Sequence, residues 1–149
     1  MKIFAIISFL TFTHLLTAQS TQGWWTNFDE AKAAAAEQRS NILLIFTGSD
    51  WCKSCMRFKK KILNSAEFRD YSKDKLVVMY VDFPARKKNK LPPTQTNHNE
   101  QLAEQFNRSG TFPNIFLMDA AGNILANPQF ERQSVTDFIY ELEQSFSNK

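Results

Sequence analysis

Two cysteines, Cys52 and Cys55, are the only ones in this chain of 149 residues, and they stand three positions apart. They follow an apolar run, residues 42–46, and precede a stretch from Met56 to Phe83 that contains neither proline nor glycine. This pattern predicts a buried strand that leads directly into a helix. Residues three apart lie on the same side of a helical turn, so the two sulfur atoms could join. Such a pair at the start of a helix is typical of a dithiol redox site.

The chemistry of the pair depends on how readily its first thiol, that of Cys52, ionises. A helix N-terminus carries about half a positive charge and unpaired N–H groups, which stabilise a thiolate. Lowering a thiol pKa from about 8.5 to about 7 is worth roughly 2 kcal/mol, of which a helix dipole supplies about 0.3–1. The neighbouring cation of Lys53 is the candidate for tuning the site further, by stabilising the reduced form and making the disulfide more oxidising.

Residues 1–18 have the pattern of a secretory signal peptide. Lys2 is the basic flank, residues 3–16 are almost wholly apolar, and the small residues Ala18 to Ser20 suit cleavage. The apolar run is short and interrupted for a membrane span, so no stable membrane insertion is expected after cleavage; an uncleaved N-terminal anchor is the alternative. Export to a bacterial periplasm or to the outside would place the cysteines where disulfides persist.

The rest of the chain suits one domain. Residues 19–23 are predicted to be a flexible leader and residues 24–149 a single domain with one core, supplied by 11 of the chain's 14 Phe and by its three Trp. The formal net charge of +3 gives no reason to expect a nucleic acid partner. A monomer is expected. No other cysteine is present for a structural bridge, and a disulfide that closes so small a loop would add little as a staple.

Periodicity and capping residues predict alternating helices and strands. Capping spacings, in which an acid stands three positions after the cap, occur at Asn27, Asn64, Asn97 and Ser134. Helices are expected over residues 27–37, 52–63, 64–71, 97–106 and 134–146, and strands over residues 41–47, 76–81, 115–118 and 124–126. Strands joined through helices should lie parallel, and the hairpin at residues 121–123 adds an antiparallel pair. The predicted class is α/β, with a mixed central sheet flanked by helices on both faces.

This order of elements, together with Trp51-Cys52-x-x-Cys55 and Phe112-Pro113, resembles the thioredoxin superfamily over residues 24–146. Segments 46–52, 82–84 and 110–113 are most similar to small exported bacterial thioredoxin-like thiol:disulfide oxidoreductases. The resemblance implies the thioredoxin fold and an enzyme that reduces, forms or exchanges protein disulfides through a mixed disulfide. It also implies that no bound cofactor is needed, that protein thiols and disulfides are the substrates, and that a redox partner protein exists.

The resemblance also assigns roles to positions of this chain. Cys52 corresponds to the exposed attacking thiol and Cys55 to the shielded resolving thiol. Trp51 corresponds to the aromatic residue that flanks the site, and Pro113 to a cis proline that faces the disulfide. The backbone of Phe112 corresponds to the edge with which an extended substrate pairs, by strand addition.

Several residues depart from the family pattern. Phe46 stands where the family often has a buried acid, Lys60 where thioredoxin has a kinking proline, and Asn114 where a threonine is common. Lys53 and Ser54 replace the Gly-Pro pair of reducing thioredoxins. These departures leave the dithiol chemistry in place and the direction of electron flow open.

An alternative reading is a thioredoxin-fold binding or metal-handling module, in which the Cys52–Cys55 pair binds zinc or copper without significant redox turnover. After signal removal the chain keeps one histidine, His98, and three soft ligands do not close a tetrahedral site within one chain. No metal site is therefore predicted, and His98 is expected to be solvated in a loop.

Other residues receive structural readings. The basic run at residues 86–90 is expected to be a solvated loop that could shape partner choice. Asp50 is expected to be a plain surface charge, and electrostatic tuning of Cys52 is the alternative. Trp24 and Trp25 are expected to pack in the core or at its edge.

Overall fold

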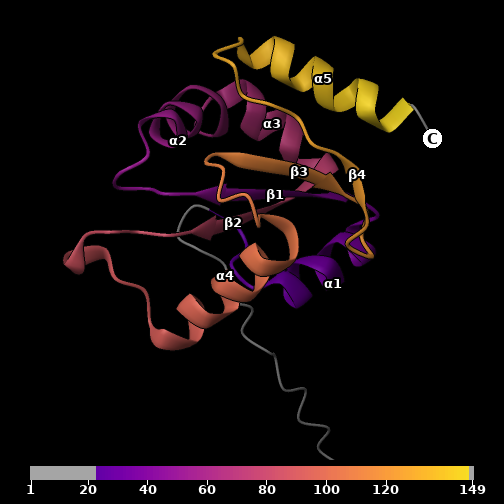
Figure 1. Cartoon of the computed structure of the whole chain (residues 1–149). Helices are drawn as coiled ribbons and strands as arrows, with labels where there is room; N and C mark the ends of the chain where they lie inside the picture. Colours follow the sequence, from indigo (N-terminus) through magenta and orange to yellow (C-terminus); the bar gives the residue numbers. More distant parts are fainter. Residues whose placement is uncertain (1–22, 148–149) are drawn as a thin grey trace, which may run out of the picture.

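A four-stranded sheet with the order β2-β1-β3-β4 lies at the centre of the fold (Figure 1). The structure is a computed structural model that describes residues 23–147, so the predicted signal peptide and nearly all of the leader lie outside the described residues. The strands are β1 (Asn41–Thr47), β2 (Leu76–Asp82), β3 (Asn114–Met118) and β4 (Ile124–Ala126). β2 runs parallel to β1, whereas β3 runs antiparallel to β1 and β4 antiparallel to β3. The predicted mixed sheet is confirmed.

The direction of β3 corrects one expectation. β3 follows a helix, so it was expected to lie parallel to its neighbours, but Phe46 faces Asn114 and Ile42 faces Met118. The register of the sheet gives the reason. Thr47 at the end of β1 faces Asp82 at the end of β2, and β3 begins at this same edge of the sheet. A strand that begins where its neighbour ends must run the opposite way. This arrangement brings the residue before β3, Pro113, to the end of β1.

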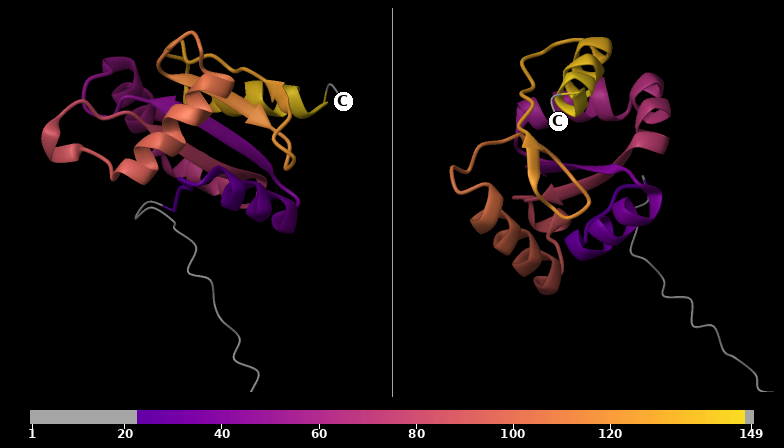
Figure 2. Two further views of the ribbon diagram at one scale, coloured as in Figure 1. Left: turned by 60° about the horizontal axis from the view of Figure 1, so that its bottom comes forward. Right: turned by 90° about the vertical axis from the view of Figure 1, so that its right-hand side faces the viewer.

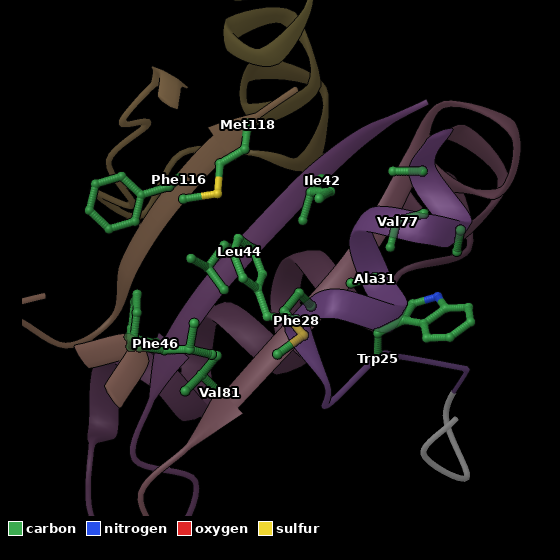
Figure 3. Close-up of a cluster of buried hydrophobic side chains, with 14 residues drawn as sticks. Trp25, Phe28, Ala31, Ile42, Leu44, Phe46, Val77, Val81, Phe116 and Met118 are labelled. Carbon is green, nitrogen blue, oxygen red and sulfur yellow. The ribbon is translucent and has the colours of Figure 1, made fainter. Parts of the chain in front are cut away.

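Helices cover both faces of the sheet, as expected (Figures 1 and 2). One face carries α1 (Phe28–Gln38) and α4 (Pro93–Phe106), and the other carries α2 (Lys53–Phe58), α3 (Ala66–Lys75) and α5 (Val135–Ser147). Side chains alternate along β1, so Ile42, Leu44 and Phe46 pack in the core cluster to which α1 and α4 contribute. Figure 3 shows these three side chains together with Phe28 and Ala31 of α1. Leu43 and Ile45 pack on the other side, against the apolar residues of α2, α3 and α5. β1 is thus buried on both faces, as its continuous apolar sequence predicts.

The helix that follows the cysteines has the expected length but not a uniform geometry. α2 continues without a break into a π-helical segment, Lys59–Leu63, which together with α2 fills the range predicted for one helix. No helix within residues 23–147 combines the length and apolar character that crossing a bilayer requires.

Of the four predicted helix caps, two, Asn27 and Ser134, are confirmed. Asn27 accepts the N–H of Glu30 at the start of α1, and Ser134 accepts the N–H of Asp137 at the start of α5. The cap of α3 is Ser65 rather than Asn64, because Asn64 still belongs to the end of the preceding π-helical segment. α3 also extends beyond the predicted end, to Lys75.

α4 begins earlier than predicted, at Pro93 rather than after Asn97. Proline fits the first helical position, since the N–H group that it lacks would have no helical partner there. The loop between β2 and α4 is correspondingly shorter and contains a 3₁₀ turn, Lys87–Asn89.

Candidate active site

The two cysteines lie at the junction between β1 and α2. They form a disulfide, and their Cα atoms are 5.2 Å apart. Cys52 is the N-cap of α2, and its sulfur accepts the backbone N–H of Cys55 at 3.2 Å. The predicted junction of strand and helix is confirmed. An amide N–H aimed at the Cys52 sulfur is the local interaction that would stabilise a thiolate in the reduced protein.

Cys52 is less exposed than the resemblance implied. It retains 6 % of its surface and Cys55 retains 2 %, so both are buried, although the order of exposure is the expected one. The cause lies in the immediate contacts of the Cys52 sulfur, which is bonded to the Cys55 sulfur and lies 3.3 Å from the hydroxyl of Ser54. A partner protein that reaches the Cys52 sulfur would therefore also contact exposed side chains beside it, such as that of Trp51.

Trp51 is the largest exposed side chain beside the disulfide, with 47 % of its surface accessible. Its ring meets the ring of Phe112 edge to face, with centroids 5.3 Å apart, and its Nε1 donates to the carbonyl of Phe83 at 2.7 Å. A β-carbon on Gly48 would overlap the Trp51 ring, so only glycine leaves room for this placement. Sequence reasoning missed Gly48; the signal available was a glycine directly after a buried strand.

Phe112 and Pro113 reach the site from the other side of β1. The bond between them is cis, as the resemblance implied. The Phe112 ring lies between those of Trp51 and Phe83, at 5.3 Å and 5.7 Å between centroids. The structure thus brings together Cys52, Cys55, Trp51, Phe112 and Pro113, and the functional roles assigned to them stay predictions.

Ser54 is a residue that sequence reasoning noted only as a departure from Gly-Pro. Its Oγ lies 3.3 Å from the Cys52 sulfur and 3.4 Å from the carbonyl oxygen of Phe112. The sulfur of a disulfide carries no hydrogen, so the hydroxyl is the donor in either contact. Ser54 therefore connects the attacking sulfur with the segment that precedes the cis proline. Its position in the first turn of α2 was the signal that could have pointed to it.

Two other sequence-based candidates have plain surroundings. Lys53 is the exposed first residue of α2, and its tuning of the site stays a prediction. Phe46, at the position where the family often has an acid, is fully buried and meets the ring of Phe116 edge to face.

Asp50 is more than the surface charge that the sequence suggested. Its carboxylate accepts the backbone N–H groups of Ala85 and Arg86, at 2.8 Å and 3.0 Å, and the side-chain amide of Asn89 at 2.8 Å. The N–H of Ala85 contributes most to holding the pKa of Asp50 below its ordinary value, and Asn89 and Arg86 add to the effect. Asp50 therefore fastens the loop after β2 to the segment that carries the cysteines.

His98 does not lie in a solvated loop, because α4 begins before it. It lies within α4, and its Nε2 accepts the backbone N–H of Phe28 at 3.2 Å. Trp24 and Trp25 are buried in the core, as predicted. Residues 23–147 contain no group of three or more His, Cys, Asp or Glu side chains arranged to hold a metal ion.

Comparisons with known proteins agree with this arrangement. A family model described as thioredoxin-like matches residues 24–120. The disulfide bond reductase DsbH of Chlamydia pneumoniae is 37 % identical over 107 residues, which are 72 % of this chain and 63 % of DsbH. A solved structure of a DsbH oxidoreductase has a TM-score of 0.76 at 29 % identity, covering 91 % of this chain and 92 % of that one. A thioredoxin from Thermus thermophilus has a TM-score of 0.60 at 18 % identity, covering 81 % and 85 % of the two chains, and supports the fold alone.

The match thus spans less than two thirds of the length of the Chlamydia reductase. The family model covers more than half of this chain and includes the β1–α2 junction, both cysteines and the cis proline. The strand order and the solved structures point the same way. This chain belongs to the thioredoxin-like family.

Proposed function

We propose that this protein is an exported thiol:disulfide oxidoreductase that acts on protein substrates and works mainly as a reductase. The observation that carries the proposal is the Cys52–Cys55 pair at the start of α2, with the N–H of Cys55 on the Cys52 sulfur and the cis proline at the neighbouring strand. The direction is supported by the similarity to a disulfide bond reductase over 72 % of the chain.

The reaction needs only the two sulfur atoms of this chain. In the reduced protein the Cys52 thiolate attacks one sulfur of a substrate disulfide and forms a mixed disulfide, while the second substrate sulfur leaves as a thiolate and takes up a proton. Cys55 then loses its proton and attacks the Cys52 sulfur. The Cys52–Cys55 bond forms, and the first substrate sulfur leaves and is protonated. Two electrons and two protons have passed to the substrate, and a redox partner must return them to the pair.

The remaining parts of the proposal concern location and assembly. Export is supported by the basic flank and apolar run at residues 1–18, and we propose a periplasmic location in a bacterium, with secretion as the alternative. We further propose that the protein works as a monomer and needs no bound cofactor, since the exchange described above is complete within one chain.

Insulin reduction tests the activity. Wild-type protein should accelerate precipitation of the insulin B chain in the presence of dithiothreitol, and Cys52→Ser should abolish the acceleration. Cys55→Ser is the matched control, because it retains the attacking thiol: once reduced and freed of dithiothreitol, it should stop at a mixed disulfide with insulin, detected as a covalent adduct. Equal rates for wild type and Cys52→Ser would contradict the proposal.

A further inference from the structure

The loop between β2 and α4 carries an unusual charge, and it adjoins the dithiol. We propose that its residues 84–91, called here the basic loop, recognise an acidic segment of the partner protein, so that thiols and disulfides flanked by Asp or Glu react fastest. The inference rests on the proposed function and adds to it the class of substrate.

The basic loop is fastened to the residues directly before Cys52. The Asp50 carboxylate holds the backbone of Ala85 and Arg86. One residue before the loop, the carbonyl of Phe83 accepts the Nε1 of Trp51. Figure 1 and the left view of Figure 2 show the loop projecting from the same end of the molecule as the turn between β1 and α2. A partner that reaches Cys52 therefore passes beside this loop.

The charge of the basic loop has one sign. Residues 84–91 contain four cations and no acid, and all four side chains are exposed: Arg86, Lys87, Lys88 and Lys90. The ion pairs formed within residues 23–147 are Lys32–Asp29 and Lys75–Glu143, and neither involves the loop. These cations are therefore available to a partner.

The carboxylates near the loop offset only part of its four positive charges. Asp50, which accepts three donors of the loop, carries one negative charge beside Arg86, and Asp82 accepts both the N–H and the hydroxyl of Ser49. Glu100 of α4 lines, together with Lys90, a hollow of about 240 Å³ at the base of the loop. Lys53, on the other side of Cys52, is also exposed and adds to the positive charge around the site.

The partner that fits is a protein segment rather than a small anion. Two exposed apolar side chains flank the cysteines in the sequence, Trp51 at 47 % directly before Cys52 and Met56 at 42 % directly after Cys55, and they offer apolar contact area to a partner. Cations at the edge of an apolar contact raise the rate of encounter with an oppositely charged partner more than they raise affinity. The effect should consequently appear as a faster reaction at low salt.

Two synthetic peptides that differ only in charge test the inference. Both contain one intramolecular disulfide, flanked by Glu in the first and by Lys in the second, and their reduction by the reduced protein is followed by Trp fluorescence. Each rate is divided by the rate of the same peptide with dithiothreitol, which removes differences in intrinsic reactivity. The Glu peptide should react about 5- to 30-fold faster at low ionic strength and less than about twofold faster in 1 M salt, where charges are screened beyond about 3 Å.

Matched double variants assign the effect to the loop. Lys87→Gln/Lys88→Gln should slow the Glu peptide about 3- to 10-fold, because two exposed charge contacts are lost. The control Arg69→Gln/Lys73→Gln removes the same charge from exposed positions of α3 and should change the rate less than about twofold.

The outcomes separate the two proposals. Equal normalised rates for the two peptides, or equal slowing by the loop and control variants, would contradict the inference and leave the oxidoreductase activity standing. Failure to reduce either peptide would contradict the proposed function itself and the inference with it.

Discussion

At the scale of single residues, the site depends on two small residues beside the disulfide, Gly48 and Ser54. Gly48 leaves the space that the Trp51 ring occupies, and Ser54 reaches both the Cys52 sulfur and the Phe112 carbonyl. A thiolate is a much stronger acceptor than a disulfide sulfur. On reduction the Ser54 hydroxyl should therefore turn fully toward Cys52 and leave the Phe112 carbonyl free to pair with substrate.

Replacing Ser54 by alanine tests this contact. Ser54→Ala should destabilise the Cys52 thiolate, lower its fraction at neutral pH and make the potential of the pair more negative, by about 30 mV for each 1.4 kcal/mol lost. Thiolate absorbance against pH and equilibration with glutathione measure the two quantities. Ser54→Thr retains the hydroxyl and should restore both.

Lys53→Gln provides the comparison for the Ser54 variant. The effect of an exposed cation should fade at high salt, whereas the effect of a direct hydrogen bond should persist. Unchanged thiolate ionisation in Ser54→Ala at every salt concentration would show that the hydroxyl does not act on the sulfur.

At the scale of elements, a chain of side-chain amides fixes the segment that carries the cis proline. Asn127 donates to Asn114, Asn114 donates to Asn107, and Asn107 donates to the carbonyl of Thr111. Asn107 is buried, with 4 % of its surface exposed. The chain joins the end of α4, the start of β3 and the segment after β4, so it supports the position of Phe112 and Pro113 relative to the disulfide.

Removing Asn107 should affect both stability and activity. Asn107→Ala leaves the Asn114 amide and the Thr111 carbonyl without this partner, which costs about 1–3 kcal/mol. Thermal unfolding measures the loss, and insulin reduction should slow because the proline segment shifts. Asn127→Ala is the control, since Asn127 is exposed and stands at the outer end of the chain of amides; an equal loss for both variants would contradict the role given to Asn107.

The same elements show what local sequence could and could not predict. The apolar run of β1, the caps Asn27 and Ser134, and the cis Phe112-Pro113 bond were predicted, because each depends on residue types close together in the sequence or on the resemblance. The antiparallel direction of β3 and the role of Asp50 were missed, because they depend on contacts between residues 35 to 76 positions apart. Adjacent candidates such as Asn64 and Ser65 compete for one cap, and spacing alone did not decide between them.

At the scale of the whole molecule, the redox state of the pair is linked to the stability of the fold. A disulfide between residues three apart closes a very small loop, for which chain-entropy arguments allow about 2 kcal/mol of stabilisation. A reductase has a disulfide that is favoured over the dithiol in the folded protein. The direction of electron flow therefore predicts which form of this protein unfolds first.

We expect the oxidised protein to unfold several degrees above the reduced protein, since about 1 kcal/mol shifts the midpoint of a domain of this size by roughly 2–8 °C. Calorimetry with and without a reductant measures the difference. Cys52→Ser cannot form the disulfide, so its unfolding midpoint should be the same with and without the reductant. A reduced form that is more stable than the oxidised form would mean that the pair drives disulfide formation instead.

The exposed lysines and arginine of the basic loop also form a natural cleavage point for trypsin. A cut there would divide the chain into a first piece with the dithiol and a second piece with the proline, although pairing between β1 and β3 would keep the pieces together. A substrate protein that covers the basic loop should slow its cleavage by trypsin. The rate of cleavage of Cys55→Ser held in a mixed disulfide with a substrate would therefore show whether the substrate contacts the loop.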